Sequence, residues 1–220
     1  MLEDLRMAEL LCARLCHDLT GPIGAVNNGA EFLSEEGFNL QNQAVELIVS
    51  SAFSAVTRLQ FYRMAYGAVK ERGEANLSEQ QKLAQDFFAD GKITLDWPDS
   101  HTESAGVSIS LKMSRLIFNL LIMSSASLVR GGTITVRIGQ DGGPEGLKWA
   151  TVVSQGTGLK WEPQTEKILA GECLREEMDP KNVQSFLTKR FAEDISAKID
   201  HTLTDTGLTL KLTLAAGNVN

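Results

Sequence analysis

The chain has a deficit of positive charge and no apolar run long enough to cross a membrane. Its 220 residues include 21 Lys and Arg against 28 Asp and Glu, which gives a formal net charge of -7 at pH 7. Holding a phosphate backbone requires the opposite sign, so the charge argues against nucleic acid as a partner. No apolar segment reaches the ~20 residues that a bilayer requires, and residues 1–6 form an acidic start without a cationic leader. We therefore expect a cytoplasmic protein that contacts no membrane.

Cysteine is also scarce, and its pattern does not favour a disulfide framework. The three cysteines, Cys12, Cys16 and Cys173, are an odd number in a chain that is long enough to fold without covalent cross-links. Reduced thiols are therefore expected. The content of 43% hydrophobic and 22% charged residues is that of an ordinary globular protein with room for two compact units. Such a composition argues against a disordered chain or a coiled-coil rod.

Residues 2–70 carry helical periodicity that is interrupted only around residues 35–39, which predicts two long helices in a hairpin. In the first helix, apolar or small residues recur at the heptad positions that face a partner. These are Leu5, Ala8, Cys12, Leu15, Leu19, Pro22, Val26, Gly29 and Leu33. The second helix, from about residue 42 to residue 69, repeats the pattern with Ala44, Ile48, Ser51, Ala55, Leu59, Tyr62, Tyr66 and Val69. A single hairpin leaves much of this seam exposed, so we expect a homodimer in which two hairpins form a four-helix bundle.

The pattern changes period after a candidate linker, Gly67 to Asn76, and a short polar stretch with helical spacing that ends near Gly91. Strand-like alternation follows at residues 93–97, 107–110, 133–138, 148–153, 199–204 and 208–214. A helix is expected over residues 112–129, and Asp179-Pro180 indicates the start of another that runs to about Lys198. The turns are expected at residues 130–132 and 205–207. This order predicts an α+β protein, with a helical hairpin over residues 1–72 and an α/β sandwich with a mixed sheet over residues 73–220.

The surroundings of His17 are the most informative part of the sequence. If Leu15 and Leu19 lie on the seam, His17 lies on the opposite side of the helix and faces water. The positions three, four and seven residues away are Ala13, Arg14, Thr20, Gly21 and Gly24, and nearly all of them are small. Glycine inside a helix costs ~1 kcal/mol relative to alanine, and proline costs several times that, so stability does not explain this composition. A flat, accessible surface beside an exposed imidazole does explain it.

Pro22 has two interpretations. It either ends one helix, with Gly24 in a loop, or it bends a helix that continues. Because the seam stays in register through Val26 and Leu33, we favour the continuous, kinked helix.

The segment from His17 to Pro22 resembles the H-box of sensor histidine kinases, in which an acidic residue directly follows a phosphoacceptor histidine and a proline lies five positions on. Residues 11–18, 22–29 and 58–68 are more closely similar to the ChpT-type histidine phosphotransferases of alphaproteobacterial phosphorelays. The resemblance implies that the hairpin is followed by a unit similar to the ATPase domain of histidine kinases. It also implies that His17 accepts a phosphoryl group and that Asp18 holds the imidazole in the productive tautomer or takes its proton.

We expect receiver domains to dock on the small-residue surface around His17, with Asn28 further along the same helix and arginines that could contact an acidic receiver. The candidate residues of this surface are Ala13, Arg14, Thr20, Gly21, Gly24, Asn28, Arg58 and Arg63. The expected partners are the receiver domains of response regulators and of a hybrid histidine kinase.

The second unit departs from the kinase pattern where a kinase binds ATP. Asn119 is present on the helix that corresponds to the magnesium-binding helix, but Ser154 occupies the position of the aspartate that binds adenine. A second glycine-rich segment is missing, because residues 159–179 contain only Gly171. A neutral hydroxyl does not replace a charge-assisted acceptor, so ATP binding is expected to be lost.

These observations predict a relay. His17 is expected to take a phosphoryl group from a receiver aspartate and pass it to another, with Mg²⁺ held by the receiver and no cofactor or metal on this chain. A metal site at Cys12, Cys16 and His17 is not expected, because Cys12 belongs to the seam and His17 points outward. Two alternatives stay open, namely an ATP-dependent sensor histidine kinase core and a non-catalytic dimeric scaffold that binds receivers.

Overall fold

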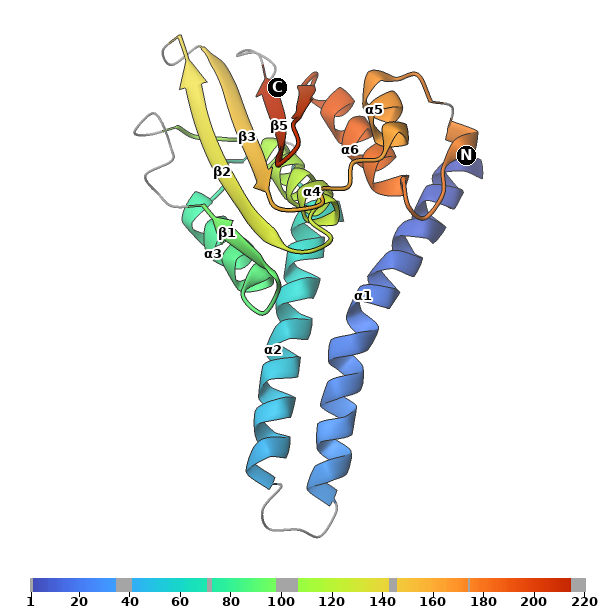
Figure 1. Cartoon of the computed structure of the whole chain (residues 1–220), viewed down its shortest axis with the longest axis vertical. Coiled ribbons are helices and arrows are strands. Elements are labelled where there is room, and N and C mark those ends of the chain that lie inside the picture. The colour runs from blue at the N-terminus through green and yellow to red at the C-terminus, as the bar shows by residue number, and fades with distance from the viewer. Residues whose placement is uncertain are drawn as a thin grey trace.

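The computed structural model describes residues 2–34, 41–70, 73–97, 107–142, 146–173 and 175–214. Two long helices, α1 (Leu2–Ser34) and α2 (Gln41–Tyr66), form the expected hairpin, and its end projects away from an α/β unit (Figure 1). The α/β unit contains the helices α3 (Leu77–Phe88), α4 (Leu111–Ser127), α5 (Pro163–Ala170) and α6 (Val183–Asp194), with a short 3-10 helix, η2 (Arg175–Glu177). The predicted combination of a helical hairpin and an α/β sandwich is therefore confirmed.

Helix α1 is continuous through Pro22, as the register of its apolar residues predicts. Proline has no N–H to donate to the carbonyl of Asp18, four residues earlier, and its ring crowds that carbonyl. The axis of α1 changes direction near the middle of the helix (Figure 1). A kink at this position has an identifiable cause in Pro22. The expected interruption at residues 35–39 lies outside the described residues.

The second half of α1 packs on α2, and the first half packs on α6. Near the hairpin end, Gly29 is buried against Ala44 and Ile48, so that a Cβ atom added at Gly29 would lie 2.7 Å from Cγ1 of Ile48. Towards the N-terminus, Met7 and Leu10 are buried in a cluster that includes Val183, Phe186 and Leu187 of α6.

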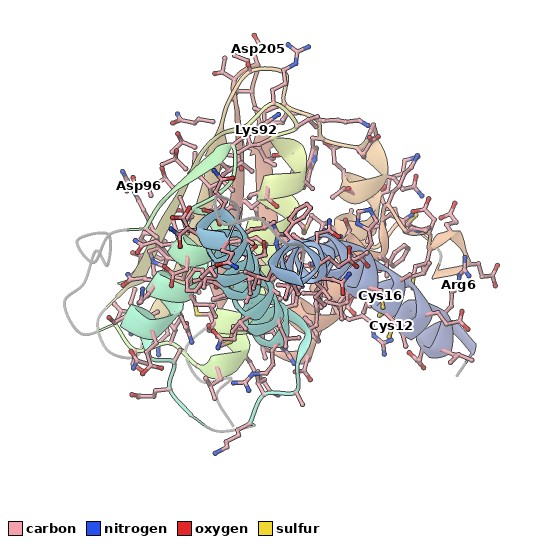
Figure 2. The ribbon with its side chains drawn as sticks, turned by 90° about the horizontal axis from the view of Figure 1, so that it is seen from below. Arg6, Cys12, Cys16, Lys92, Asp96 and Asp205 are labelled. Carbon is pink, nitrogen blue, oxygen red and sulfur yellow. The ribbon has the colours of Figure 1, made fainter. Side chains whose placement is uncertain are left out.

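Because α1 changes its partner, the predicted seam is wrong over the first half of the helix. Leu5, Ala8 and Cys12 are exposed there. The seam assumed that both helices run side by side over their whole length, whereas the buried residues of the first half face the α/β unit. Cys12 and Cys16 both lie on the exposed surface of α1 (Figure 2).

Helix α2 has a buried face and, in addition, an apolar face that is exposed. Ala44, Ser51 and Tyr62 are buried, as the predicted seam requires. Leu59 is 57% exposed, so its place on the seam is wrong, and the helix ends at Tyr66 instead of Val69. The exposed face consists of Val45, Val49, Phe53, Val56 and Leu59. We call these five residues the α2 stripe.

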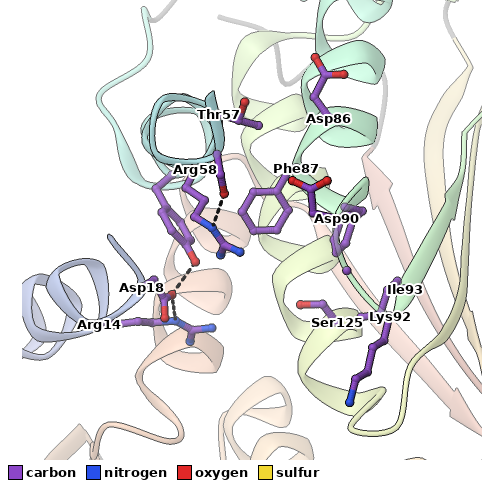
Figure 3. A pocket seen from close by; sticks show the side chains of 14 residues that line it. Arg14, Asp18, Thr57, Arg58, Asp86, Phe87, Asp90, Lys92, Ile93 and Ser125 are labelled. Carbon is purple, nitrogen blue, oxygen red and sulfur yellow. Dashed lines mark hydrogen bonds and ion pairs between the residues drawn. The ribbon is translucent and has the colours of Figure 1, made fainter. Parts of the chain in front are cut away.

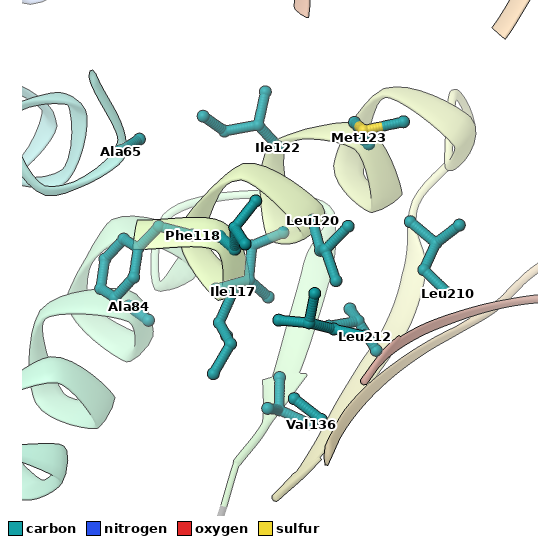
Figure 4. Close-up of a cluster of buried hydrophobic side chains, with 14 of the residues drawn as sticks. Ala65, Ala84, Ile117, Phe118, Leu120, Ile122, Met123, Val136, Leu210 and Leu212 are labelled. Atoms are coloured by element: carbon teal, nitrogen blue, oxygen red, sulfur yellow. The ribbon is translucent and has the colours of Figure 1, made fainter. Parts of the chain in front are cut away.

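The sheet is mixed and five-stranded, with the order β1-β2-β3-β5-β4. The strands are β1 (Ile93–Asp96), β2 (Gly132–Asp141), β3 (Leu147–Gln155), β4 (Lys198–Leu203) and β5 (Gly207–Leu214). Strand β1 runs parallel to β2, and the other neighbouring pairs are antiparallel. Helix α4 covers one face, where the fully buried Ile117 and Leu120 lie close to Val136 and Leu212 of the sheet (Figure 4).

The end of α2 is built into this same core. Phe61 and Ala65 are fully buried, and the Phe61 ring lies 4.8 Å from the ring of Phe118 of α4, measured between centroids. It also stacks on Phe87 of α3 at 3.9 Å. The hairpin is therefore joined to the α/β unit by packing as well as by the chain.

Two local predictions in the second unit are wrong. Residues 107–110 form no strand beyond a single bridge between Glu74 and Ser110, because Ser110 is the N-cap of α4 and its Oγ accepts from the Met113 N–H. Helix α6 begins at Val183, after Asn182, and not at Asp179-Pro180. The Asp179 carboxylate instead accepts from the N–H groups of Lys181 and Asn182, which closes a turn.

Helix α5 and the 3-10 helix η2 are additions that the sequence reading did not predict. Pro163 occupies the first turn of α5, and Gly171 ends it in the left-handed conformation, with φ 84°. Within the ranges described above, no helix is both long enough and apolar enough to cross a bilayer.

Candidate functional site

The side chain of His17 projects from the middle of α1 into solvent. It is 88% exposed, which confirms the predicted direction. Leu15 and Leu19 are partly buried on the other side of the helix. One turn later, the hydroxyl of Thr20 donates to the carbonyl of Cys16 at 2.6 Å and so lies back along the helix. The imidazole therefore stands clear of its neighbours on the helix surface.

Asp18 is the group that contacts the imidazole. Its Oδ1 lies 3.1 Å from Nδ1 of His17. Consecutive side chains on a helix diverge by about 100°, but the two polar ends meet here in spite of that divergence. The Asp18 side chain is 24% exposed, so it lies between the open surface of α1 and the hairpin interior.

Tyr62 of α2 holds the other carboxylate oxygen of Asp18. Its phenolic O–H donates to Oδ2 at 2.5 Å, and Nε of Arg14 lies 3.9 Å from the same atom (Figure 3). Burial, followed by the hydrogen bond to Asp18, raises the pKa of Tyr62 far above its usual range, so this phenol stays a donor. The sequence analysis placed Tyr62 on the seam without a polar role. The signal that it missed is a phenol at a seam position, where a buried hydroxyl needs a partner.

This arrangement determines which nitrogen of His17 is available for reaction. An ionised carboxylate only accepts hydrogen bonds, so Nδ1 carries the proton that faces Asp18. In the neutral ring, Nε2 then holds the lone pair, and it lies on the exposed side chain. The site presents a nucleophilic nitrogen to anything that docks on α1.

The small residues near His17 form an open surface. Ala13, Thr20, Gly21 and Asn28 are exposed, and Gly24 is partly exposed. A Cβ atom added at Gly21 or Gly24 would meet nothing within 4 Å. A glycine at position 21 also has a local explanation. It precedes Pro22, and a Cβ atom there would crowd the proline ring. No packing within the described chain requires a glycine at Gly24.

The three candidate arginines lie in two places. Arg14 and Arg58 line a cavity of about 340 Å³ between the hairpin and the α3–β1 region, together with Asp18, Phe87 and Lys92 (Figure 3). The guanidinium carbon of Arg58 lies 5.5 Å from the centre of the Phe87 ring, and its Nε donates to Ser54. Arg63 is exposed and does not line this cavity. It follows Arg58 by five residues, which turns it about 140° around the helix.

The described residues contain no group of three or more His, Cys, Asp or Glu side chains that could hold a metal ion. The sequence analysis separated Cys12 from His17 by placing Cys12 on the seam. That reason is wrong, because Cys12 is exposed.

The two residues that the sequence analysis compared with nucleotide-binding positions are Asn119 and Ser154. Asn119 is fully buried, and its Nδ2 donates to the carbonyls of Ala65 and Arg115 at 2.7 and 2.8 Å. Its Oδ1 accepts from Gln184 at the start of α6, and the hydroxyl of Tyr66 donates to Oε1 of Gln184 at 2.7 Å. The Asn119 amide is therefore bound at both its oxygen and its nitrogen within the buried core.

Ser154 is the second residue that the sequence analysis assigned to a nucleotide position. Its side chain is fully buried on β3, and its neighbours across the sheet are Ile134 and Leu208. Its hydroxyl has no hydrogen-bond partner among the residues that the structure describes. Residues 163–170, in the passage that the sequence analysis found poor in glycine, form α5.

Three comparisons with known proteins each match a phosphotransferase. Residues 77–207 match the family described as the histidine phosphotransferase C-terminal domain. The chain is 34% identical over 200 residues to the protein phosphotransferase ChpT of Brucella abortus (strain 2308), which covers 90% of each chain. A solved structure of a bacterial phosphotransferase is 31% identical, with a TM-score of 0.76 over 94% of this chain and 96% of that one.

Proposed function

This chain belongs to the histidine phosphotransferase family, and from that premise we propose that it relays phosphoryl groups between receiver-domain aspartates in the cytoplasm through phosphorylated His17. It is a phosphotransferase by family. The observation that carries the proposal is the exposed imidazole of His17, whose Nδ1 faces the carboxylate of Asp18. The partners in this proposal are receiver domains of response regulators and of a hybrid histidine kinase.

The transfer is a displacement at phosphorus. The lone pair on Nε2 of His17 forms a bond to the phosphorus of a receiver's aspartyl phosphate, and the bond from phosphorus to the aspartate oxygen breaks. The aspartate leaves as a carboxylate with the bonding electron pair. In the second half of the cycle, the carboxylate of another receiver attacks phosphohistidine, and the electron pair of the N–P bond returns to Nε2.

Asp18 stabilises the ring while it carries the phosphoryl group. Bond formation at Nε2 leaves positive charge on an imidazole that still holds its proton at Nδ1. The Asp18 carboxylate lies 3.1 Å from that nitrogen, where it offsets the charge. Because the same carboxylate fixes the tautomer before the attack, it serves both steps.

A nucleotide has no part in this proposal. The engaged amide of Asn119 and the buried hydroxyl of Ser154 support a chain that does not charge itself from ATP. The phosphoryl group must then arrive on another protein. The Mg²⁺ that neutralises charge on the transferred group belongs to the receiver in this proposal, so the chain needs no metal of its own.

The docking surface includes the open face around His17. Ala13, Thr20, Gly21, Gly24 and Asn28 leave space for a receiver to bring its phosphoryl group to Nε2. Arg14 and Arg58 are accessible from the adjoining cavity and complement an acidic partner. Arg63 belongs to this surface only if the receiver also covers the other side of α2.

The active form in this proposal is a homodimer. The α2 stripe is an apolar face that the hairpin of one chain leaves uncovered. Exposed apolar residues grouped on one helix are typical of an interface. A second copy of the hairpin would cover this stripe in a four-helix bundle.

Transfer from a purified receiver labelled with ³²P on its aspartate tests the relay. We expect label on the wild-type chain and on His201→Ala, which removes another histidine far along the sequence, and none on His17→Ala. Labelled His17→Ala would exclude the proposed acceptor. Label from [γ-³²P]ATP alone would indicate a kinase, and unimpaired signalling by His17→Ala would indicate a scaffold.

A further inference from the structure

The two oxygens of the Asp18 carboxylate have different partners. Oδ1 lies 3.1 Å from Nδ1 of His17, and Oδ2 accepts from the hydroxyl of Tyr62 at 2.5 Å. Arg14 approaches Oδ2 only to 3.9 Å, so it contributes charge more than direction. An aspartate with one free oxygen can rotate about both of its side-chain torsions. The bond to Tyr62 removes that freedom.

Tyr62 is fixed by the hydrophobic core in which α2 meets the α/β unit. It is 5% exposed, and its ring stacks on that of Tyr66 with centroids 5.6 Å apart. The rings of Phe61 and Phe87 meet it edge-on at 6.1 and 5.9 Å. A tyrosine packed on several sides has one rotamer, so the position of its hydroxyl is set by the core and not by the exposed helix surface.

From these contacts we propose that Tyr62 is a positioning residue for phosphoryl transfer, which aligns Asp18 so that His17 keeps its proton on Nδ1 and presents Nε2. This inference rests on the proposed function of His17. Tyr62 touches neither the imidazole nor the incoming phosphoryl group, and it acts only through Asp18. It also links α2 to the reacting atom on α1, across 44 positions of the sequence.

The variant Tyr62→Phe removes the hydroxyl and keeps the ring. We expect the rate of transfer from a phosphorylated receiver to fall about tenfold, or ~1.4 kcal/mol of transition-state stabilisation, because Asp18 is then no longer held against Nδ1 of His17. The fraction of the Nδ1–H tautomer of His17 should fall as well. Nitrogen-15 chemical shifts of histidine-labelled full-length protein measure this fraction, and His17→Ala assigns the signal among the three histidines of the chain.

Tyr66→Phe is the matched control. It also removes one hydroxyl and keeps the stacked ring, but that hydroxyl donates to Gln184 and not to Asp18. We expect it to keep the wild-type transfer rate and the wild-type tautomer.

Two results would overturn the inference. One is a wild-type rate and tautomer in Tyr62→Phe. The other is an equal loss and an equal tautomer shift in Tyr66→Phe, which would show that the Tyr62 hydroxyl has no specific role. Neither result bears on the relay itself, which fails only if His17→Ala is still labelled.

Discussion

At the scale of single residues, Gly24 and Gly29 lie on the same helix for opposite reasons. Gly29 is required by packing, because Ile48 and the carbonyl of Ala44 lie 2.7 and 3.2 Å from the place of its missing Cβ. Gly24 has no such neighbour. It lies two turns from His17 on the same face of the helix, so the proposed receiver surface is its explanation.

The two glycines therefore predict opposite effects on stability. Gly24→Ala should raise the free energy of unfolding by about 0.5–1 kcal/mol, because alanine is the better helix former. Gly29→Ala should lower it by about 1–3 kcal/mol through overpacking. Urea denaturation followed by circular dichroism measures both. Gly24→Leu should in addition slow transfer from a labelled receiver, and an unchanged rate would remove Gly24 from the docking surface.

Tyr66 predicts a loss of stability in alkali. Burial, the largest cause, raises the pKa of its phenol from 10.0 to about 12. Between these values the folded chain keeps a proton that the unfolded chain releases, so the free energy of unfolding falls as pH rises, by up to ~1.4 kcal/mol per pH unit. Denaturation at a series of pH values should show a shallower decline for Tyr66→Phe than for the wild type. Parallel declines would contradict this assignment.

At the scale of elements, the α2 stripe predicts the oligomeric state. Val49, which is 62% exposed, and Val56 both belong to this stripe. If both are replaced by glutamate, a homodimer has four like charges in its bundle, two from each chain. We expect the mass in solution to fall from twice 24.0 kDa to 24.0 kDa, measured by light scattering after gel filtration. Val129→Glu is the control, because Val129 is 63% exposed but lies on the α/β unit. A wild-type chain that is already monomeric at micromolar concentration would exclude the dimer.

Periodicity predicted the long elements well, because their apolar residues recur over several turns or strand positions. Helix α4, strand β2 and the continuity of α1 through Pro22 all follow from the spacing of their apolar residues. Short elements with local caps were harder. Residues 107–110 alternate like a strand, but the Ser110 hydroxyl caps a helix, and α5 depends on Pro163 and Gly171 more than on its apolar content.

At the scale of the whole molecule, the sequence could not show which distant surfaces meet. The exposure of His17 follows from the helical phase of Leu15 and Leu19, whereas the bond from Tyr62 to Asp18 joins residues on two helices. The packing of Met7 and Leu10 on α6 likewise depends on the path of α1 beyond its kink. Both features follow from tertiary packing, for which the periodicity of one helix carries no information.

The buried network around Asn119 joins the hairpin to the α/β unit and predicts a large effect of mutation. Asn119→Ala would remove the bond that Gln184 donates to Asn119 and the bond that Asn119 donates to the carbonyl of Ala65. We expect it to lower the free energy of unfolding by about 2–4 kcal/mol in urea denaturation. The exposed Asn28→Ala should change that free energy by less than about 0.5 kcal/mol. A stable Asn119→Ala variant that had lost nucleotide binding would instead assign Asn119 to a ligand site.

The isolated position of His17 on one open face has a kinetic consequence. In the proposed relay, a donor and an acceptor both need the same imidazole, so they occupy it in turn and never together. Transfer then follows ping-pong kinetics, with a covalent intermediate that outlives each complex. An excess of unphosphorylated acceptor competes with the phosphorylated donor for the unphosphorylated chain. A high acceptor concentration therefore lowers the rate at which the donor phosphorylates His17.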